Sequence, residues 1–214
     1  MKAVIFAGPS LPPSAQPAIP GVEWRPPARQ GDVYRAAREG PDAIGLIDGY
    51  FDAVPSVWHK EILWAMAQGI RVYGAASLGA LRAAELAPFG MIGVGWVFEQ
   101  FRDGVLTDDD EVAVLHAPAE LDYRSLSVAM VDIRATLVAA VREGVVSGET
   151  AVTLTASAKE RLYKERDWLS VLATTDEQDR SQLEAWLADG RVRSKWDDAI
   201  ALVKAIGSGC SRQF

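Results

Sequence analysis

A chain of 214 residues that is 49% hydrophobic and 24% charged has the composition of a soluble globular protein, and it can bury a core of ordinary size. Its net charge of −7 supplies no general basic field, so we expect no binding to nucleic acid. No apolar run approaches the ~20 residues of a membrane helix. The only cysteine, Cys210, excludes an intramolecular disulfide, which favours a cytoplasmic location.

The first part of the chain predicts a buried strand and a short helix. The strand runs from Lys2 to Ala7. The Pro-rich stretch 11–20 that follows cannot form a helix or a central strand. Asp32 then begins a short helix as its N-cap, and Gly40 ends it.

The stretch 43–86 organises the rest of the prediction. It contains two apolar runs, 43–47 and 70–73, each followed by a helical pattern that begins near Pro55 and near Ala80. This strand–helix–strand–helix spacing predicts two parallel, neighbouring strands. Ligands bind beyond the carboxyl ends of such strands. Asp48, Gly74 and Ser77 fall at that edge, and so do the loop with Gly8 and Ser10 and the first turn of the Pro55 helix, which carries His59.

Beyond residue 90 the pattern changes from mixed to helical. Residues 91–101 predict part helix and part loop, and the alternation from Glu111 to His116 predicts a strand that Pro118 ends. Helical patterns follow from Leu126 onward. We therefore predict an α/β fold, in which a parallel Rossmann-like sheet with flanking helices spans residues 1–120 and a helical layer spans 121–214.

Ser77 is the first candidate catalytic residue. It lies between a strand and a helix in Gly74-Ala75-Ala76-Ser77-Leu78-Gly79, and its small neighbours resemble those of a nucleophile elbow. The strict elbow has Gly two positions before the Ser, where this chain has Ala75. The alternative is a plain helix N-cap, which spacing alone favours.

His59 and Asp48 are the other two candidate catalytic residues. His59 lies in the first turn of the predicted helix, where the helix dipole favours a neutral ring that can act as a base. It is equally well interpreted as a packed or surface histidine. Asp48 could orient His59 or simply form a turn before Gly49.

Further residues are candidates for substrate binding. Arg82 follows Ser77 by about one turn and could hold an anion, although an ion pair with Glu85 is the simpler interpretation. The acidic run 108–111 could bind a hard cation, but a solvated turn is favoured, and we predict no metal and no cofactor. The candidates for substrate binding are Gly8, Ser10, Lys60, Gly74, Arg82, Glu111 and His116.

Three stretches carry a resemblance to a known family. IGLIDGYFDAVPSVWHKEILWAMAQGIRVYGAASLGALRAAELAPFGMIGVG resembles the core of the TfuA-like family, and VIFAGPSLP precedes it. FRDGVLTDDDEVAVLHAPAE and MVDIR are similar to the family's continuation, so the resemblance covers about residues 1–135. The chain departs from the usual family sequence at Leu78 and Ala117, where Met and Gly are common.

The resemblance implies an accessory of YcaO-type enzymes, which use ATP to activate a peptide amide and install a thioamide. Such an accessory recruits the enzyme or delivers sulfur. The partners that the resemblance implies are the YcaO-type enzyme, a small sulfur-carrier protein and, indirectly, the precursor peptide. Cys210, in a Gly/Ser tail, is a poor persulfide relay. Release of sulfide from a carrier thiocarboxylate is acyl transfer, which suits a Ser nucleophile with a His base.

Two alternatives stay open at the level of sequence. The protein could be a non-catalytic scaffold or allosteric activator of the enzyme. It could also be a phosphate- or nucleotide-binding module that uses Gly8-Pro9-Ser10, but the chain contains neither a P-loop nor a G-x-G-x-x-G motif. Seven tryptophans favour an interaction surface, and we expect Trp58 and Trp96 to contribute to it.

Overall fold

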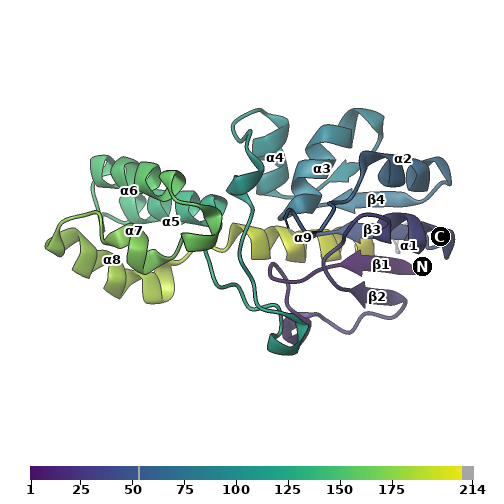
Figure 1. Cartoon of the computed structure of the whole chain (residues 1–214), viewed down its shortest axis with the longest axis horizontal. Helices are drawn as coiled ribbons and strands as arrows, with labels where there is room; N and C mark the ends of the chain where they lie inside the picture. The colour runs from purple at the N-terminus through teal and green to yellow at the C-terminus, as the bar shows by residue number, and fades with distance from the viewer. Residues whose placement is uncertain (53, 209–214) are drawn as a thin grey trace. The chain divides into compact units, whose positions relative to one another are not determined.

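The computed structural model describes residues 1–52 and 54–208, so Cys210 lies outside the described residues. The chain forms two compact units (Figure 1). The first unit contains residues 1–109, 118–124 and the chain from Lys195 onward, and the second contains 110–117 and 125–194. The sequence predicted one division, at residue 120, with every later helix in the helical layer. In the structure, the last helix belongs to the unit that contains the sheet.

A five-stranded parallel sheet forms the centre of the first unit. Its strands lie in the order β2-β1-β3-β4-β5, and every neighbouring pair is parallel. The prediction of an α/β fold with a parallel, Rossmann-like sheet and a C-terminal helical region is therefore confirmed. The strands are β1 (Ala3–Phe6), β2 (Val22–Arg25), β3 (Ala43–Leu46), β4 (Arg71–Gly74) and β5 (Ile92–Gly93).

Helices flank this sheet because its central strands are apolar on both faces. β1 and β3 are buried at every residue, as expected for strands covered on both sides. One face packs on the last helix, where Leu202 and Ile206 approach Gly45 so closely that a Cβ there would lie 2.9 Å from each. The helices of this unit are α1 (Asp32–Arg38), α2 (His59–Ala67), α3 (Leu78–Leu86), α4 (Trp96–Arg102) and α9 (Ser194–Ser208).

The second unit is helical and has a core of its own. Met130, Ile133 and Leu137 of its first helix are buried and pack with Leu154 and Leu183. Its helices are α5 (Met130–Arg142), α6 (Gly148–Glu160), α7 (Trp168–Leu172) and α8 (Glu177–Gly190). In the described part of the chain, no helix is both long and apolar enough to cross a bilayer.

The predicted strand from Glu111 to His116 is wrong. A 3-10 turn (Asp109–Glu111) precedes an irregular segment, in which His116 forms only an isolated bridge with Ser125. The alternating pattern that predicted the strand is also absent, because Glu111, Val112 and Ala113 are buried in succession on a segment that joins none of the five strands of the sheet. The sequence interpretation also missed β2 and β5.

Candidate functional site

The first candidate site lies where the carboxyl ends of β1 and β3 meet, at the point where the strand order changes direction. Asp48 follows β3 there and is 2% exposed. Its Oδ2 accepts the backbone N–H groups of Gly8 at 2.8 Å and Ser10 at 2.9 Å, and the Ser10 hydroxyl donates to Oδ1 at 2.7 Å. The fold thus brings together three residues that the sequence placed at this edge.

These bonds give Asp48 a structural role. Both carboxylate oxygens accept donors from the loop after β1, so Asp48 clamps that loop onto the loop after β3. The loop is closely packed at Gly8, because a Cβ there would lie 2.4 Å from the ring of Pro27 and 3.6 Å from that of Tyr123. The orientation of His59 by Asp48 stays a prediction that these contacts do not support.

Ser77 lies after β4 in a tight turn. The N–H of Ser77 donates to the carbonyl of Ala75 at 2.7 Å across Ala76, whose φ of 66° is rare for a residue with a side chain. Gly74 and Gly79 make the turn possible, because a Cβ on Gly79 would lie 1.7 Å from the carbonyl oxygen of Leu46. The resemblance to a nucleophile elbow therefore extends to the backbone, with Ala76 rather than Ser77 at the positive φ.

Ser77 is also the N-cap residue of α3, but its hydroxyl group does not cap the helix. The backbone carbonyl of Ser77 accepts the N–H groups of Ala80 at 2.9 Å and Leu81 at 3.3 Å. No amide of the described first turn donates to its side chain. Ser77 is 4% exposed, so a substrate would reach its hydroxyl group only after local opening of the turn.

His59, Glu85 and Arg82 form a second cluster. The Nε2 atom of His59 lies 2.8 Å from Oε2 of Glu85, and Nη1 of Arg82 donates to the same oxygen at 2.7 Å. Arg82 is anchored in turn, because its Nε donates to the carbonyl of Val57 at 3.0 Å. Glu85 therefore holds the ring of His59 and leaves Nδ1 as the ring atom available to a substrate.

This cluster lies apart from Ser77. Glu85 is eight residues beyond Ser77 in the chain, which corresponds to about 12 Å along α3. A nucleophile and its base need to lie within about 3 Å of each other, so this conformation does not pair Ser77 with His59. Instead, Ser56, Arg82 and Glu85 line a pocket of about 410 Å³, together with the acidic side chains of Asp108 and Asp109.

Lys60 is exposed on α2, beside His59. The remaining two candidates belong to the second unit. Glu111 is buried there, and Arg134 donates to both of its oxygens at 2.9 Å. Burial raises the pKa of Glu111, but the hydrogen bonds from Arg134 and Lys159 outweigh burial and hold the pKa below its usual value. His116 is half-buried, with Nδ1 2.8 Å from the carbonyl of Ala117.

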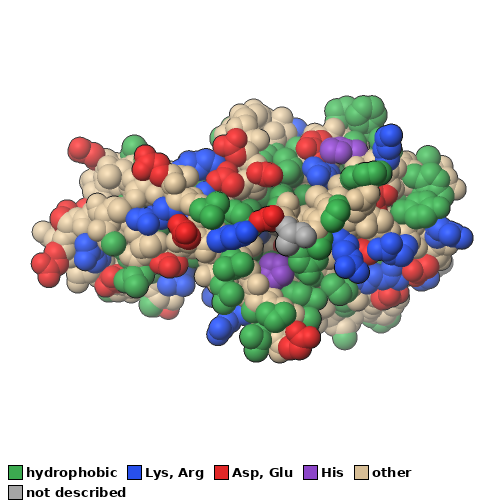
Figure 2. Space-filling model, in the orientation of Figure 1, with side chains coloured by type: hydrophobic (Ala, Val, Ile, Leu, Met, Phe, Trp, Pro, Cys, Tyr) green, Lys and Arg blue, Asp and Glu red, His purple; other side chains and the backbone are tan. Residues whose placement is uncertain are grey.

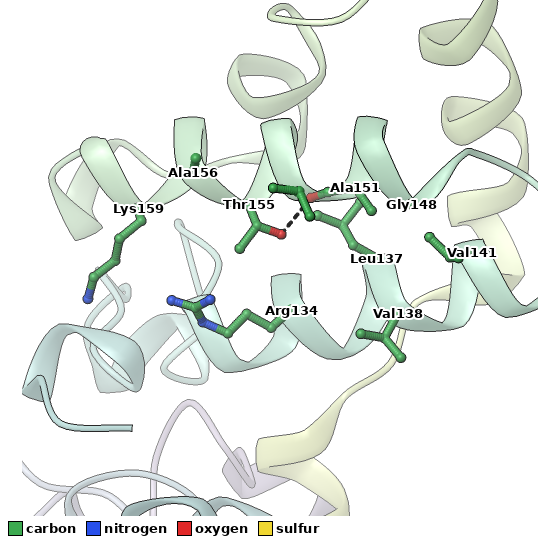
Figure 3. Close-up of a pocket in the computed structure, with 10 residues that line it drawn as sticks. Arg134, Leu137, Val138, Val141, Gly148, Ala151, Thr155, Ala156 and Lys159 are labelled. Carbon is green, nitrogen blue, oxygen red and sulfur yellow. Dashed lines mark hydrogen bonds between the residues drawn. The ribbon is translucent and has the colours of Figure 1, made fainter. Parts of the chain in front are cut away.

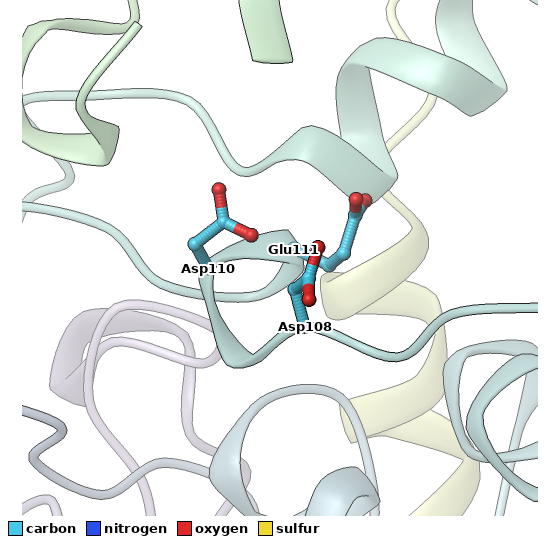
Figure 4. Close-up of side chains that lie close together, drawn as sticks. All are labelled: Asp108, Asp110 and Glu111. Carbon is cyan, nitrogen blue, oxygen red and sulfur yellow. The ribbon is translucent and has the colours of Figure 1, made fainter. Parts of the chain in front are cut away.

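The acidic run brings together the carboxylates of Asp108, Asp110 and Glu111, with one oxygen of each within 4.8 Å of the others (Figure 4). Asp110 and Glu111 are already paired with cations of the second unit, Lys159 among them. Carboxylates that are neutralised by lysine and arginine offer little to a metal ion. The prediction that no metal binds here is not tested by this arrangement.

The sequence analysis missed the roles of Glu85 and Ser56. The spacing of three between Arg82 and Glu85 signalled their ion pair, but it gave no sign that His59, 26 residues away, shares the same carboxylate. Ser56 had no signal at all, since it precedes the helix in a loop. Charged side chains of both signs are mixed over the face shown in Figure 2.

The structure defines an α/β protein with the strand order of doubly wound sheets. Asp48 holds the loop after β1 at the point where that strand order reverses. A family model described as TfuA-like protein matches residues 48–167, which is more than half of the chain. The protein therefore belongs to the TfuA-like family. The match includes Asp48, His59, Ser77 and the acidic run. No curated protein matches the sequence.

Proposed function

We propose that this protein assists a YcaO-type enzyme in forming backbone thioamides on peptides. The observation that carries the proposal is the family match over residues 48–167, because the TfuA-like family is associated with YcaO systems. The match contains most of the polar side chains at the carboxyl edge of the sheet. The accessory would deliver sulfur, recruit the enzyme, or do both.

The chemical step that we propose is hydrolysis of a carrier thiocarboxylate. The hydroxyl oxygen of Ser77 attacks the carbonyl carbon, the C–S bond breaks, and the sulfur leaves as sulfide. His59 takes the hydroxyl proton, and water then hydrolyses the acyl–serine ester to give the carrier carboxylate. The net reaction consumes one water and needs no oxidant.

The tight, small-residue turn around Ser77 supports this step, because turns of this form carry the nucleophile in other folds. Because Ser77 is 4% exposed, the turn must open locally when the carrier binds. The step also requires His59 to break its contact with Glu85 and to form one with Ser77 when the carrier binds. Both residues begin helices that follow neighbouring strands, β3 and β4.

A scaffold or activator without catalysis is the second candidate. Exposed aromatic side chains of the first unit favour it, since Trp58 is 57% exposed and Phe89 is 67% exposed. Rings of this size are enriched in the centres of protein interfaces. This role requires no rearrangement of His59.

One experiment separates the two candidates. Purified protein is incubated with a thiocarboxylated sulfur carrier, and released sulfide and carrier carboxylate are measured by mass spectrometry. We expect Ser77→Ala and His59→Ala each to lower the rate by orders of magnitude, and added sulfide to restore thioamide formation. Ser147→Ala is the matched control, because Ser147 caps α6 through a hydrogen bond from Thr150. Wild-type rates for Ser77→Ala would leave only the scaffold.

A further inference from the structure

The surfaces of α1 and α2, in the first unit, combine aromatic rings with cations. Tyr34 of α1 packs against Trp64 of α2, with ring centroids 4.7 Å apart and an angle of 55° between the ring planes. Tyr34 is 41% exposed and Trp64 is half-buried, so the pair presents apolar surface to solvent. Arg38 follows Tyr34 by four residues and Lys60 precedes Trp64 by four, so each cation neighbours one of the rings on its helix. We call these four residues the aromatic–cationic face.

The two cations of this face are available to a partner. Arg38 and Lys60 are exposed, and among the residues that the structure describes neither side chain has an ion-pair or hydrogen-bond partner. The carboxylates next to them in the sequence are engaged elsewhere. Glu39 pairs with Arg25 at 2.6 Å. Glu61 is 7% exposed and accepts backbone N–H groups at the starts of both helices. Neither carboxylate therefore pairs with a cation of the face.

The cationic character continues at the start of α1. The carboxylate of Asp32 is shared between Arg35, at 2.5 Å, and Arg29, at 3.9 Å. The two arginine side chains nevertheless stay 60% and 62% exposed, so one carboxylate serves two guanidinium groups that face solvent. Figure 2 shows Lys and Arg side chains around the hydrophobic patch over α1 and α2.

A pocket of about 700 Å³ between α5 and α6 of the second unit differs in this respect (Figure 3). Its walls carry the exposed apolar side chains of Val138 and Val152. Both cations that line it, Arg134 and Lys159, contact the carboxylate of Glu111, each at 2.9 Å. Charge therefore distinguishes the aromatic–cationic face from this pocket as a place for an acidic partner.

This combination of rings and cations fits an acidic segment of a protein. Aromatic side chains and arginine are enriched at protein interfaces, and Trp58, 57% exposed two residues before Lys60, extends the apolar surface. The local positive charge contrasts with the net charge of −7 of the whole chain. A nucleic acid would bring many phosphates into that net negative field, whereas a short acidic segment needs only the face itself.

We propose that the aromatic–cationic face docks an acidic segment of a protein partner. Carboxylates of that segment lie against Arg38 and Lys60, and an apolar side chain of the segment packs on Tyr34 and Trp64. The identity of the partner, the YcaO-type enzyme, rests on the proposed function. The location of the docking surface rests on the face alone.

The test compares the affinity of the purified YcaO-type enzyme for the full-length wild type and three charge-reversal variants. Lys60→Glu and Arg38→Glu each turn an attraction for the acidic segment into a repulsion, so each dissociation constant should rise at least about tenfold at low salt. Lys60→Glu places its carboxylate in the first turn of α2, where the helix dipole favours it, so its loss of affinity does not come from unfolding. Lys204→Glu is the matched control, because Lys204 is exposed on α9 and the substitution changes the net charge by the same amount. Its affinity should be unchanged.

Salt provides a second readout. The affinity of the wild type should fall as NaCl rises from about 0.05 M to about 0.5 M, because salt screens contacts between exposed charges. Lys60→Glu and Arg38→Glu should lose less affinity over the same range. A wild-type affinity that does not depend on salt would overturn the assignment of an acidic segment.

The outcomes separate the inference from the proposed function. If the wild type binds the enzyme and both variants of the face bind as well as Lys204→Glu, the face is not the docking surface and the proposed function stands. If the wild type does not bind, the proposed function fails and the partner assigned to the face falls with it. If the wild type instead binds a single-stranded oligonucleotide and Lys60→Glu abolishes that binding, the occupant is a nucleic acid, which also overturns the proposal.

Discussion

Asp198 makes the stability of the first unit depend on pH in an unusual direction. Its carboxylate is 5% exposed and accepts the N–H groups of Trp96 at 2.8 Å and Val97 at 2.7 Å, where α4 begins. Burial raises the pKa of Asp198 to about 6, although the two backbone donors oppose it, and the charges of Asp197 and Glu99 raise it further. The folded state therefore binds a proton more readily than the unfolded state.

The sign and size follow from this difference. A carboxyl group whose pKa is raised from 3.8 to about 6 costs stability when it is charged, and that cost disappears as the pH falls through 6 towards 4. A shift of about two units corresponds to about 3 kcal/mol, of which about 2 kcal/mol appears between pH 7 and pH 4. Asp198→Asn removes this titration and keeps the shape of the side chain.

The assay is urea unfolding of the wild type and Asp198→Asn at about pH 7 and about pH 4. Taking the difference between the two proteins cancels the titration of the other groups. We expect the wild type to gain about 2 kcal/mol relative to the variant on acidification. Asp197→Asn gives an intermediate case, since loss of its charge should lower the pKa of Asp198 and reduce the gain on acidification. A pH-independent difference, or a gain for the variant, would refute the reasoning.

Four other substitutions test the packing and the clamps. Gly79→Ala should cost several kcal/mol in thermal unfolding, because its Cβ would lie 1.7 Å from the carbonyl oxygen of Leu46. Gly207→Ala, with open space around it, should be neutral or stabilising. Glu111→Gln should lower the free energy of unfolding by about 3 kcal/mol at neutral pH, because Arg134 and Lys159 lose the charge of their shared carboxylate. The difference from the wild type should shrink once the pH falls below the lowered pKa of Glu111, because the wild-type carboxylate is then protonated. Asp48→Asn should cost about 1–3 kcal/mol by chemical unfolding, because at least one of its three donors loses its acceptor; no loss would contradict the clamp.

The central strands could be predicted because their sequences are short, continuous apolar runs. β1, β3 and β4 are buried at nearly every residue, and burial on both faces leaves that pattern in the sequence. β2 is an edge strand with no buried residue, and β5 has only two residues. Neither leaves a pattern that distinguishes a strand from a loop.

The site could be predicted only in part. Parallel strands end at one edge, which was enough to place Asp48 near Gly8 and Ser10. The contact of His59 with Glu85 depends on how α2 crosses α3, and no local spacing encodes a crossing between two helices.

The most direct test of the central claim is reconstitution of thioamide formation. A purified YcaO-type enzyme, its peptide substrate, ATP and a sulfur source are incubated with and without this protein, and replacement of a peptide oxygen by sulfur is followed by mass spectrometry. Our account predicts that product forms much faster when the protein is present. Equal rates with and without it, at every ratio of protein to enzyme and with every sulfur source, would contradict the assignment as an accessory of thioamide formation.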